Sequence, residues 1–98
     1  MRCEISPLAE KDLRDIGDYI ATGNPRRAAS FIQELLTHCK QIASIPAGYT
    51  ARDDIAPGLR LCPHKNYIIF YTTTDTVVRI ERIIHGSRDV TGNPGDYF

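Results

Sequence analysis

The sequence lacks the long apolar runs of membrane proteins and secreted precursors. A membrane-spanning helix needs about 18 consecutive apolar residues, and no run in these 98 residues approaches that length. Residues 1–7 also lack the apolar stretch of a secretory signal. We therefore expect a cytoplasmic protein with no membrane partner. A chain of this length forms one domain around one modest core, so we expect a single domain over residues 1–98.

Cysteine is scarce and irregularly spaced. Cys3, Cys39 and Cys62 form an odd set with neither a disulfide pattern nor a metal-ligand spacing. The three histidines likewise have no partner at a ligand spacing. Gly86 and Ser87 lack the surrounding glycines and the lysine of a phosphate loop. The sequence therefore predicts three buried free cysteines, no metal site and no cofactor.

An excess of positive charge is absent too, because 12 basic residues balance 12 acidic ones. Proteins that hold nucleic acid through its phosphates usually carry a basic excess or a basic face. Direct binding of nucleic acid is therefore not expected. A local excess does lie between residues 60 and 88, where five basic residues stand against two acidic ones.

The strongest pattern present is a β-hairpin. Two runs rich in β-branched and aromatic residues, 67–73 and 76–85, are separated by a polar break at Thr74 and Asp75. The first run is apolar on both faces, which is typical of a central strand. Strict alternation assigns one face of the second run to Val78, Ile80, Arg82 and Ile84. Ile83 falls on the opposite face.

Two helices are predicted before the hairpin. Ser6 can accept hydrogen bonds from first-turn amides, and Pro7 fits the first helical position. The tripeptide Gly23-Asn24-Pro25 ends this helix and begins the next, and so short a connection predicts an antiparallel helical hairpin. Apolar residues recur at spacings of three and four in both helices. The charged residues of the first helix are predicted to form a solvated face; they are Lys11, Asp12, Arg14, Asp15 and Asp18.

The remaining segments are shorter. Residues 2–5 are predicted to form a strand, residues 46–58 a loop, and Leu59-Arg60-Leu61-Cys62 a strand that ends at Pro63, with His64-Lys65 as the next turn. Residues 91–98 are predicted to be a flexible tail. The element order is β-α-α-β-β-β. It predicts an α+β fold in which an N-terminal helical hairpin packs on one face of a small, mainly antiparallel sheet.

Apolar surface beyond the needs of one core indicates contacts with another protein. Phe31 and Leu36 widen the stripe of the second helix, either for deeper burial or as a docking face. Tyr97 and Phe98, the apolar pair at the end of the chain, need a surface to dock on. The candidate partner-binding residues are Ile16, Tyr19, Ile20, Phe31, Leu35, Tyr97 and Phe98.

A catalytic alternative rests on Arg60, Arg79, His85 and Arg88. A ribonuclease that activates a 2′-hydroxyl needs a general base, a general acid and a cation over the phosphate, and these residue types can fill those roles. The simpler interpretation is that the His85 ring is hydrogen-bonded to backbone and that the arginines form surface pairs, such as Arg82 with Glu81. We favour the simpler interpretation, because a surface that cuts RNA should hold more positive charge.

Several stretches between Ile5 and Asp89 resemble, in the same order, the ParE branch of the RelE/ParE toxin superfamily. They are S-P-L-A-E-K-D-L-R-D-I-G-D-Y-I, N-P-R-R-A-A-S-F-I, P-G-L-R, Y-I-I-F-Y and R-I-I-H-G-S-R-D. The resemblance implies the toxin of a type II toxin–antitoxin system, held in a hetero-oligomer by a cognate antitoxin whose extended segment wraps it. It also implies a target, since ParE proteins typically poison DNA gyrase and RelE relatives cleave messenger RNA on the ribosome.

The charge pattern favours the gyrase branch. RelE-type enzymes depend on lysines and arginines around the sheet, whereas here Lys65 is the only lysine after Lys40. The resulting hypothesis is a gyrase-binding toxin without chemistry of its own. Two alternatives stay open. One is a ribosome-dependent endoribonuclease that uses the four residues named above, and the other is a non-toxic relative that only binds its antitoxin.

Overall fold

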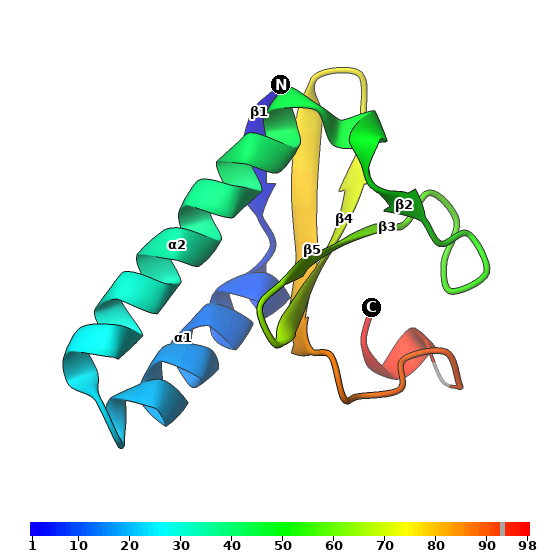
Figure 1. Ribbon diagram of the computed structural model, residues 1–98. Coiled ribbons are helices and arrows are strands. Elements are labelled where there is room, and N and C mark those ends of the chain that lie inside the picture. The colour runs from blue at the N-terminus through cyan, green and yellow to red at the C-terminus, as the bar shows by residue number, and fades with distance from the viewer. Residues whose placement is uncertain (93) are drawn as a thin grey trace.

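The computed structural model describes residues 1–92 and 94–98. Its elements are β1 (Arg2–Ile5), α1 (Pro7–Ala21), α2 (Pro25–Ser44), the 3-10 turn η1 (Pro46–Gly48), β2 (Thr50–Ala51), β3 (Arg60–His64), β4 (Tyr67–Thr73), β5 (Val77–His85) and the 3-10 turn η2 (Pro94–Asp96). The five strands form one sheet in the order β1-β5-β4-β3-β2, in which only β1 pairs in parallel. Figure 1 shows both helices on one side of this sheet. The predicted α+β fold is confirmed, with one more strand than expected.

The helix boundaries follow the predicted caps. The Ser6 side chain accepts a hydrogen bond from the Ala9 amide at 3.0 Å, and the Asn24 side chain accepts one from the Arg27 amide at 3.1 Å. Each cap satisfies one of the free amides of a first helical turn. The two helices lie side by side as an antiparallel hairpin (Figure 1). None of the helices described is long and apolar enough to cross a membrane.

Strand β3 continues further than the sequence predicted, through Pro63 to His64. The turn that follows is made by Lys65, whose φ is +55°, and Asn66. The short strand β2 pairs only with the first two residues of β3. Pro63 therefore lies where β3 forms the edge of the sheet, and its missing amide donor removes no bond to an outer strand. The predicted loop at residues 46–58 was wrong in part, because it contains η1 and β2.

A β-bulge in β5 changes which side chains face the helices. Phe70 pairs with Arg82 but Tyr71 pairs with Ile80, so Glu81 is an extra residue on β5. Beyond the bulge the alternation is inverted. Ile83 therefore joins Val78 and Ile80 in the core under the helices, while Ile84 joins Phe70 in a second core on the opposite face. The predicted faces of β5 were wrong after Ile80.

Two cores of unequal size stabilise the sheet. The larger lies between helices and sheet and includes Leu35, Ile42 and Tyr71, which expose none of their surface. It also holds Cys39 and Cys62, whose predicted burial is confirmed, whereas Cys3 is half-buried at its edge. The smaller lies on the face away from the helices and consists of Ile55, Leu59, Phe70, Ile84 and Val90. The loop before β3 and the segment after β5 cover that face.

The segment predicted as a flexible tail folds back over the smaller core. Tyr97 packs against this core, and the Phe98 ring meets the Phe70 ring edge-on at 5.2 Å. Nη1 of Arg82 also donates a hydrogen bond to the Tyr97 carbonyl at 2.7 Å. Asn93, which belongs to the predicted tail, lies outside the described residues. The aromatic pair at the end of the chain thus covers apolar surface of the sheet.

Candidate functional site

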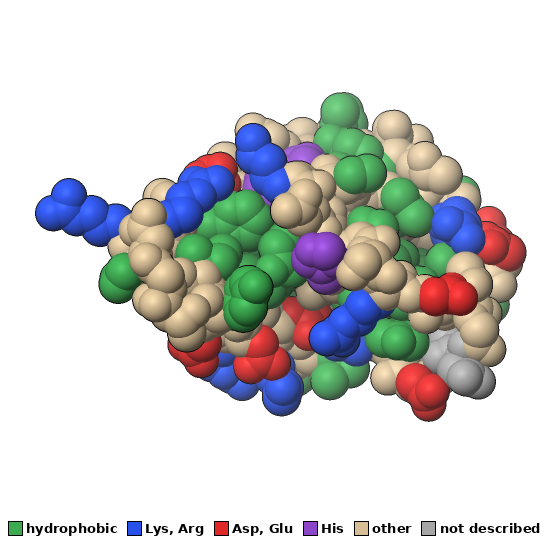
Figure 2. Space-filling model, turned by 60° about the horizontal axis from the view of Figure 1, so that its bottom comes forward, with side chains coloured by type: hydrophobic (Ala, Val, Ile, Leu, Met, Phe, Trp, Pro, Cys, Tyr) green, Lys and Arg blue, Asp and Glu red, His purple; other side chains and the backbone are tan. Residues whose placement is uncertain are grey.

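A groove of about 960 Å³ opens between the helical hairpin and the ends of β4 and β5. Its apolar lining comes from α1, from the start of α2 and from β4, and includes Leu8, Ile16, Tyr19, Ile20, Phe31 and Tyr67. Figure 2 shows apolar side chains gathered on this face beside a histidine, with charged side chains around them. The groove therefore combines an apolar patch with many charged and polar side chains.

The apolar residues of the groove differ in how much surface they expose. Ile16 and Phe31 expose only 6% of their surface and form its floor. Tyr19 exposes 75% and Leu8 49%, because both lie beside the buried stripe of α1 rather than within it. Large apolar side chains left uncovered around a groove are typical of a site that another protein covers.

An ion pair closes the bottom of the groove where α1 crosses β5. Nε and Nη2 of Arg82 each donate a hydrogen bond to the Asp12 carboxylate at 2.8 Å, and the Ile83 amide donates a third at 2.9 Å. The pairing of β1 with β5 ends at Ile80, so Asp12 satisfies an amide that a longer β1 would have satisfied. Its hydrogen bonds raise the pKa of Arg82.

Two predictions about these charges were wrong. Asp12 was expected on the solvated face of α1, but its side chain is only 11% exposed. Arg82 was expected to pair with Glu81 at the surface, but Glu81 instead accepts hydrogen bonds from Thr72 at 2.8 Å and Arg79 at 3.2 Å. The second error lies at the bulge, where the extra residue Glu81 separates Arg82 from the regular alternation of β5.

The candidate partner-binding residues fall in three places. Ile16, Tyr19, Ile20 and Phe31 all line the groove. Leu35 is fully buried in the larger core and offers no surface to a partner. The remaining two, Tyr97 and Phe98, lie across the sheet on the smaller core. Leu36, the other residue that widens the stripe of α2, is half-buried and does not line the groove.

The four residues of the catalytic alternative do not converge. His85 and Arg88 line the groove, but Arg60 and Arg79 do not. Arg60 pairs with Tyr71 and His85 with Tyr67, which places them four residues apart along β4, roughly 13 Å at the usual rise of a strand. The Arg60 side chain donates to the carbonyl of Tyr49. Nδ1 of His85 accepts from the Ser87 amide at 3.2 Å, the backbone contact of the simpler interpretation.

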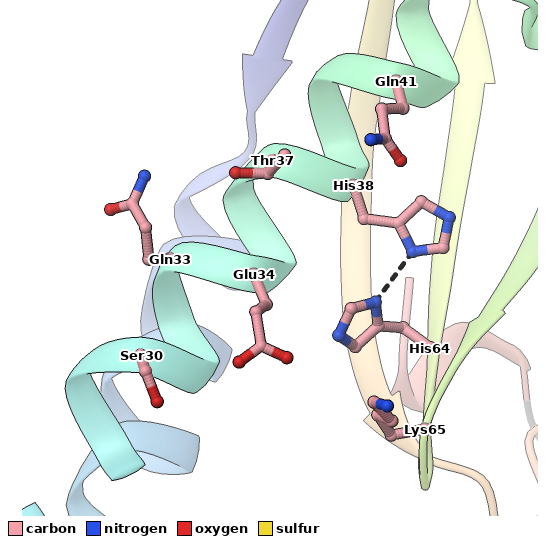
Figure 3. A pocket seen from close by; sticks show the side chains of 8 residues that line it. All are labelled: Ser30, Gln33, Glu34, Thr37, His38, Gln41, His64 and Lys65. Carbon is pink, nitrogen blue, oxygen red and sulfur yellow. Dashed lines mark hydrogen bonds between the residues drawn. The ribbon is translucent and has the colours of Figure 1, made fainter. Parts of the chain in front are cut away.

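A histidine pair that sequence analysis missed lies on the other side of α2. Nδ1 of His38 and Nδ1 of His64 are 2.8 Å apart (Figure 3). Nε2 of His38 is 3.2 Å from Sγ of Cys62. The histidines line a second depression, of about 530 Å³. No group of three or more possible metal ligands occurs within residues 1–92 and 94–98. The partners are 24 and 26 residues apart, so local spacing carried no signal.

Comparison with known proteins agrees with this architecture. Residues 3–90 match the model of a family described as the ParE toxin of a type II toxin–antitoxin system, parDE. The chain belongs to the ParE toxin family. The resemblance inferred from its motifs is thereby confirmed, and the chain is the toxin component of a type II system.

A solved structure shares the ParE fold. It is described as "Chromosomal ParDE TA system from P. aeruginosa" and matches with a TM-score of 0.75 at 20% identity, over 87% of this chain and 95% of the other. At this identity the match shows a common fold. A search of curated protein sequences gives no match.

Proposed function

We propose that this ParE-family toxin binds DNA gyrase, traps the cleaved-DNA intermediate, and is neutralised when a segment of its antitoxin occupies the groove between the helical hairpin and β5. The observation that supports the proposal best is the uncovered apolar lining of the groove, above all Tyr19. Both partners use this surface, so a bound antitoxin excludes gyrase.

The charges at the groove favour a protein partner over nucleic acid. Lys11 is paired with Asp15, Arg82 with Asp12, and Arg27 with Glu34. Lys65 and Arg88 also line the groove, and their side chains form no ion pair with the described residues. Two such cations are far fewer than the phosphate contacts from which nucleic-acid affinity is usually built.

The lining also specifies the chemistry of the antitoxin segment. An amphipathic helix can place apolar residues on the groove floor at spacings of three and four, as in other helix-in-groove complexes. The segment should carry acidic residues where it passes Lys65 and Arg88. A segment that orders only on binding can still bind tightly when it buries a large apolar area.

The test is a gyrase assay with purified toxin. Toxin at micromolar concentration should inhibit supercoiling and increase the amount of cleaved DNA, and an equimolar amount of antitoxin should restore supercoiling. Unchanged supercoiling and cleavage would count against the gyrase target. Ile45→Ala is the control variant, because Ile45 is 62% exposed but lies outside the groove. It should act on gyrase as the wild type does.

The two alternatives predict different results. A ribosome-dependent nuclease would cut messenger RNA at the ribosomal A site, and toeprinting would show the cut disappear in His85→Ala. The distance of Arg60 and Arg79 from His85 favours the gyrase target over this one. A non-toxic relative would copurify with its antitoxin yet leave growth unchanged when expressed alone.

A further inference from the structure

A single histidine connects the second helix to the sheet by side-chain hydrogen bonds. Within the described part of the chain, only two such bonds join α2 to a strand, and His38 makes both. One reaches Nδ1 of His64 and the other Sγ of Cys62, and both partners lie on β3. Figure 3 shows the two imidazoles facing each other across the space between α2 and β3. The side-chain hydrogen bonds between α2 and β3 therefore depend on the protons of this cluster.

Two arrangements of protons satisfy both contacts of His38, because burial raises the pKa of the Cys62 thiol and the sulfur keeps its proton. In the first, the thiol donates to Nε2 of His38, and His38 donates its Nδ1 proton to the bare Nδ1 of His64. In the second, the thiol donates to the Pro63 carbonyl and accepts from Nε2 of His38, and His64 donates its Nδ1 proton to the bare Nδ1 of His38. In both, Nε2 of His64 is buried without a hydrogen-bond partner.

An additional proton is poorly accommodated in either arrangement. In the first, protonation of Nδ1 of His64 would set two N–H groups against each other at 2.8 Å. With Nδ1 of His38 bare, as in the second, His64 would become a cation whose buried Nε2–H has no acceptor. Burying an unsatisfied charged group is costly. Both outcomes therefore oppose protonation of the folded pair.

The surroundings of the pair add to this effect. The titratable and charged groups that face it are Arg27, Glu34, Tyr49, Cys62 and Lys65. Glu34 is the one carboxylate among them, and it is already paired with Arg27. Burial, and then electrostatic repulsion from His38, lower the pKa of His64, and the attraction of Glu34 only partly opposes them.

We infer that the His38–His64 pair is a pH-sensitive clasp, which holds α2 against β3 at neutral pH and releases it when the pair takes up protons. The clasp adjoins the groove through aromatic contacts. The ring centroids of His64 and Phe31 are 5.6 Å apart in an edge-on arrangement, and those of Phe31 and Tyr67 are 5.7 Å apart. Phe31 and Tyr67 both line the groove, so release of α2 alters the groove wall. The inference holds whichever partner the groove binds.

Stability must then fall on the acid side of neutrality. A histidine in the unfolded chain has a pKa of about 6.5. Folding lowers the pKa of His64, so the unfolded state binds more protons as the pH falls below that value. The stabilisation is complete above about pH 6.5 and is lost below it. For one imidazole kept neutral, the unfolding equilibrium constant rises up to about tenfold between pH 7.5 and 5.5.

Urea unfolding at these two pH values tests the inference. From pH 7.5 to 5.5 the unfolding equilibrium constant should increase in both proteins by different factors. The factor for the wild type should be up to about ten times the factor for His64→Gln. His85→Gln is the matched control, because it removes an imidazole that contacts Ser87 at the surface, and it should keep the wild-type increase. In NMR titrations, the His64 imidazole and the Phe31 ring should shift with a common midpoint.

Two results would overturn the clasp. One is an equal pH dependence in the wild type and His64→Gln. The other is a wild type that becomes more stable toward pH 5.5, as expected if the two imidazoles shared the added proton in a charge-assisted bond. If His64→Gln does not fold, either of two other variants can be compared with the wild type in its place. His64→Phe preserves the edge contact with Phe31, and His38→Gln removes the imidazole on the helix side of the pair.

Discussion

Replacement of Asp12 by asparagine should destabilise the fold far more than its position on a helix surface suggests. The carboxylate accepts two hydrogen bonds from the Arg82 guanidinium and one from the Ile83 amide. An asparagine side chain has one acceptor oxygen, and its amide group would face the guanidinium donors. The variant would leave the charge of Arg82 largely buried and uncompensated, since its side chain is 13% exposed.

The magnitude follows from what is lost. Removing one partner of a buried ion pair usually costs about 3–5 kcal/mol. We expect the lower part of this range, about 3 kcal/mol, because the asparagine oxygen can still accept from the Ile83 amide. Urea unfolding of wild type and Asp12→Asn at neutral pH measures the difference in unfolding free energy.

The control for this variant lies one turn further along the same helix. Asp15 is paired with Lys11, but their side chains are 61% and 63% exposed. A pair so open to solvent contributes about 0–1 kcal/mol, so Asp15→Asn should have little effect. The reasoning is refuted if Asp12→Asn loses no more stability than Asp15→Asn. A double-mutant cycle with Arg82→Gln isolates the pairwise contribution.

Two further predictions concern the groove and the clasp. Tyr19→Ala should weaken antitoxin binding about thirtyfold in calorimetric titrations, since burying most of a large aromatic side chain contributes about 2 kcal/mol, whereas Ile45→Ala should bind as the wild type does. Glu34→Gln should move the NMR titration of His64 to lower pH, because the Glu34 carboxylate raises the pKa of His64; an unchanged titration would mean that Arg27 already cancels its charge.

Local signals in the sequence predicted much of the fold. Ser6-Pro7 and Gly23-Asn24-Pro25 identified both helix starts, because each cap is made by a side chain within three residues of the amide that it satisfies. The central strand and its hairpin were evident from β-branched and aromatic residues. Four groove residues were also predicted, since they belong to the apolar stripes of α1 and α2 or lie beside them.

The missed features depend on contacts between distant residues. Arg82 is 70 residues from Asp12, and His64 is 26 residues from His38. The bulge at Glu81 is a single extra residue, which pattern analysis of β5 alone cannot detect because it is defined by the register against β4. Leu35 was assigned to the partner surface because periodicity locates the apolar stripe of a helix but not which part the sheet covers.

The central claim is that this toxin acts through the groove by binding protein. The most direct test is the amount of gyrase-cleaved DNA that accumulates with micromolar wild-type toxin, Tyr19→Ala and Ile45→Ala. Tyr19 exposes its ring at the groove and Ile45 lies outside it. The account predicts that wild type and Ile45→Ala increase cleaved DNA alike while Tyr19→Ala does not. No increase with wild type, or an equal increase with Tyr19→Ala, would contradict it.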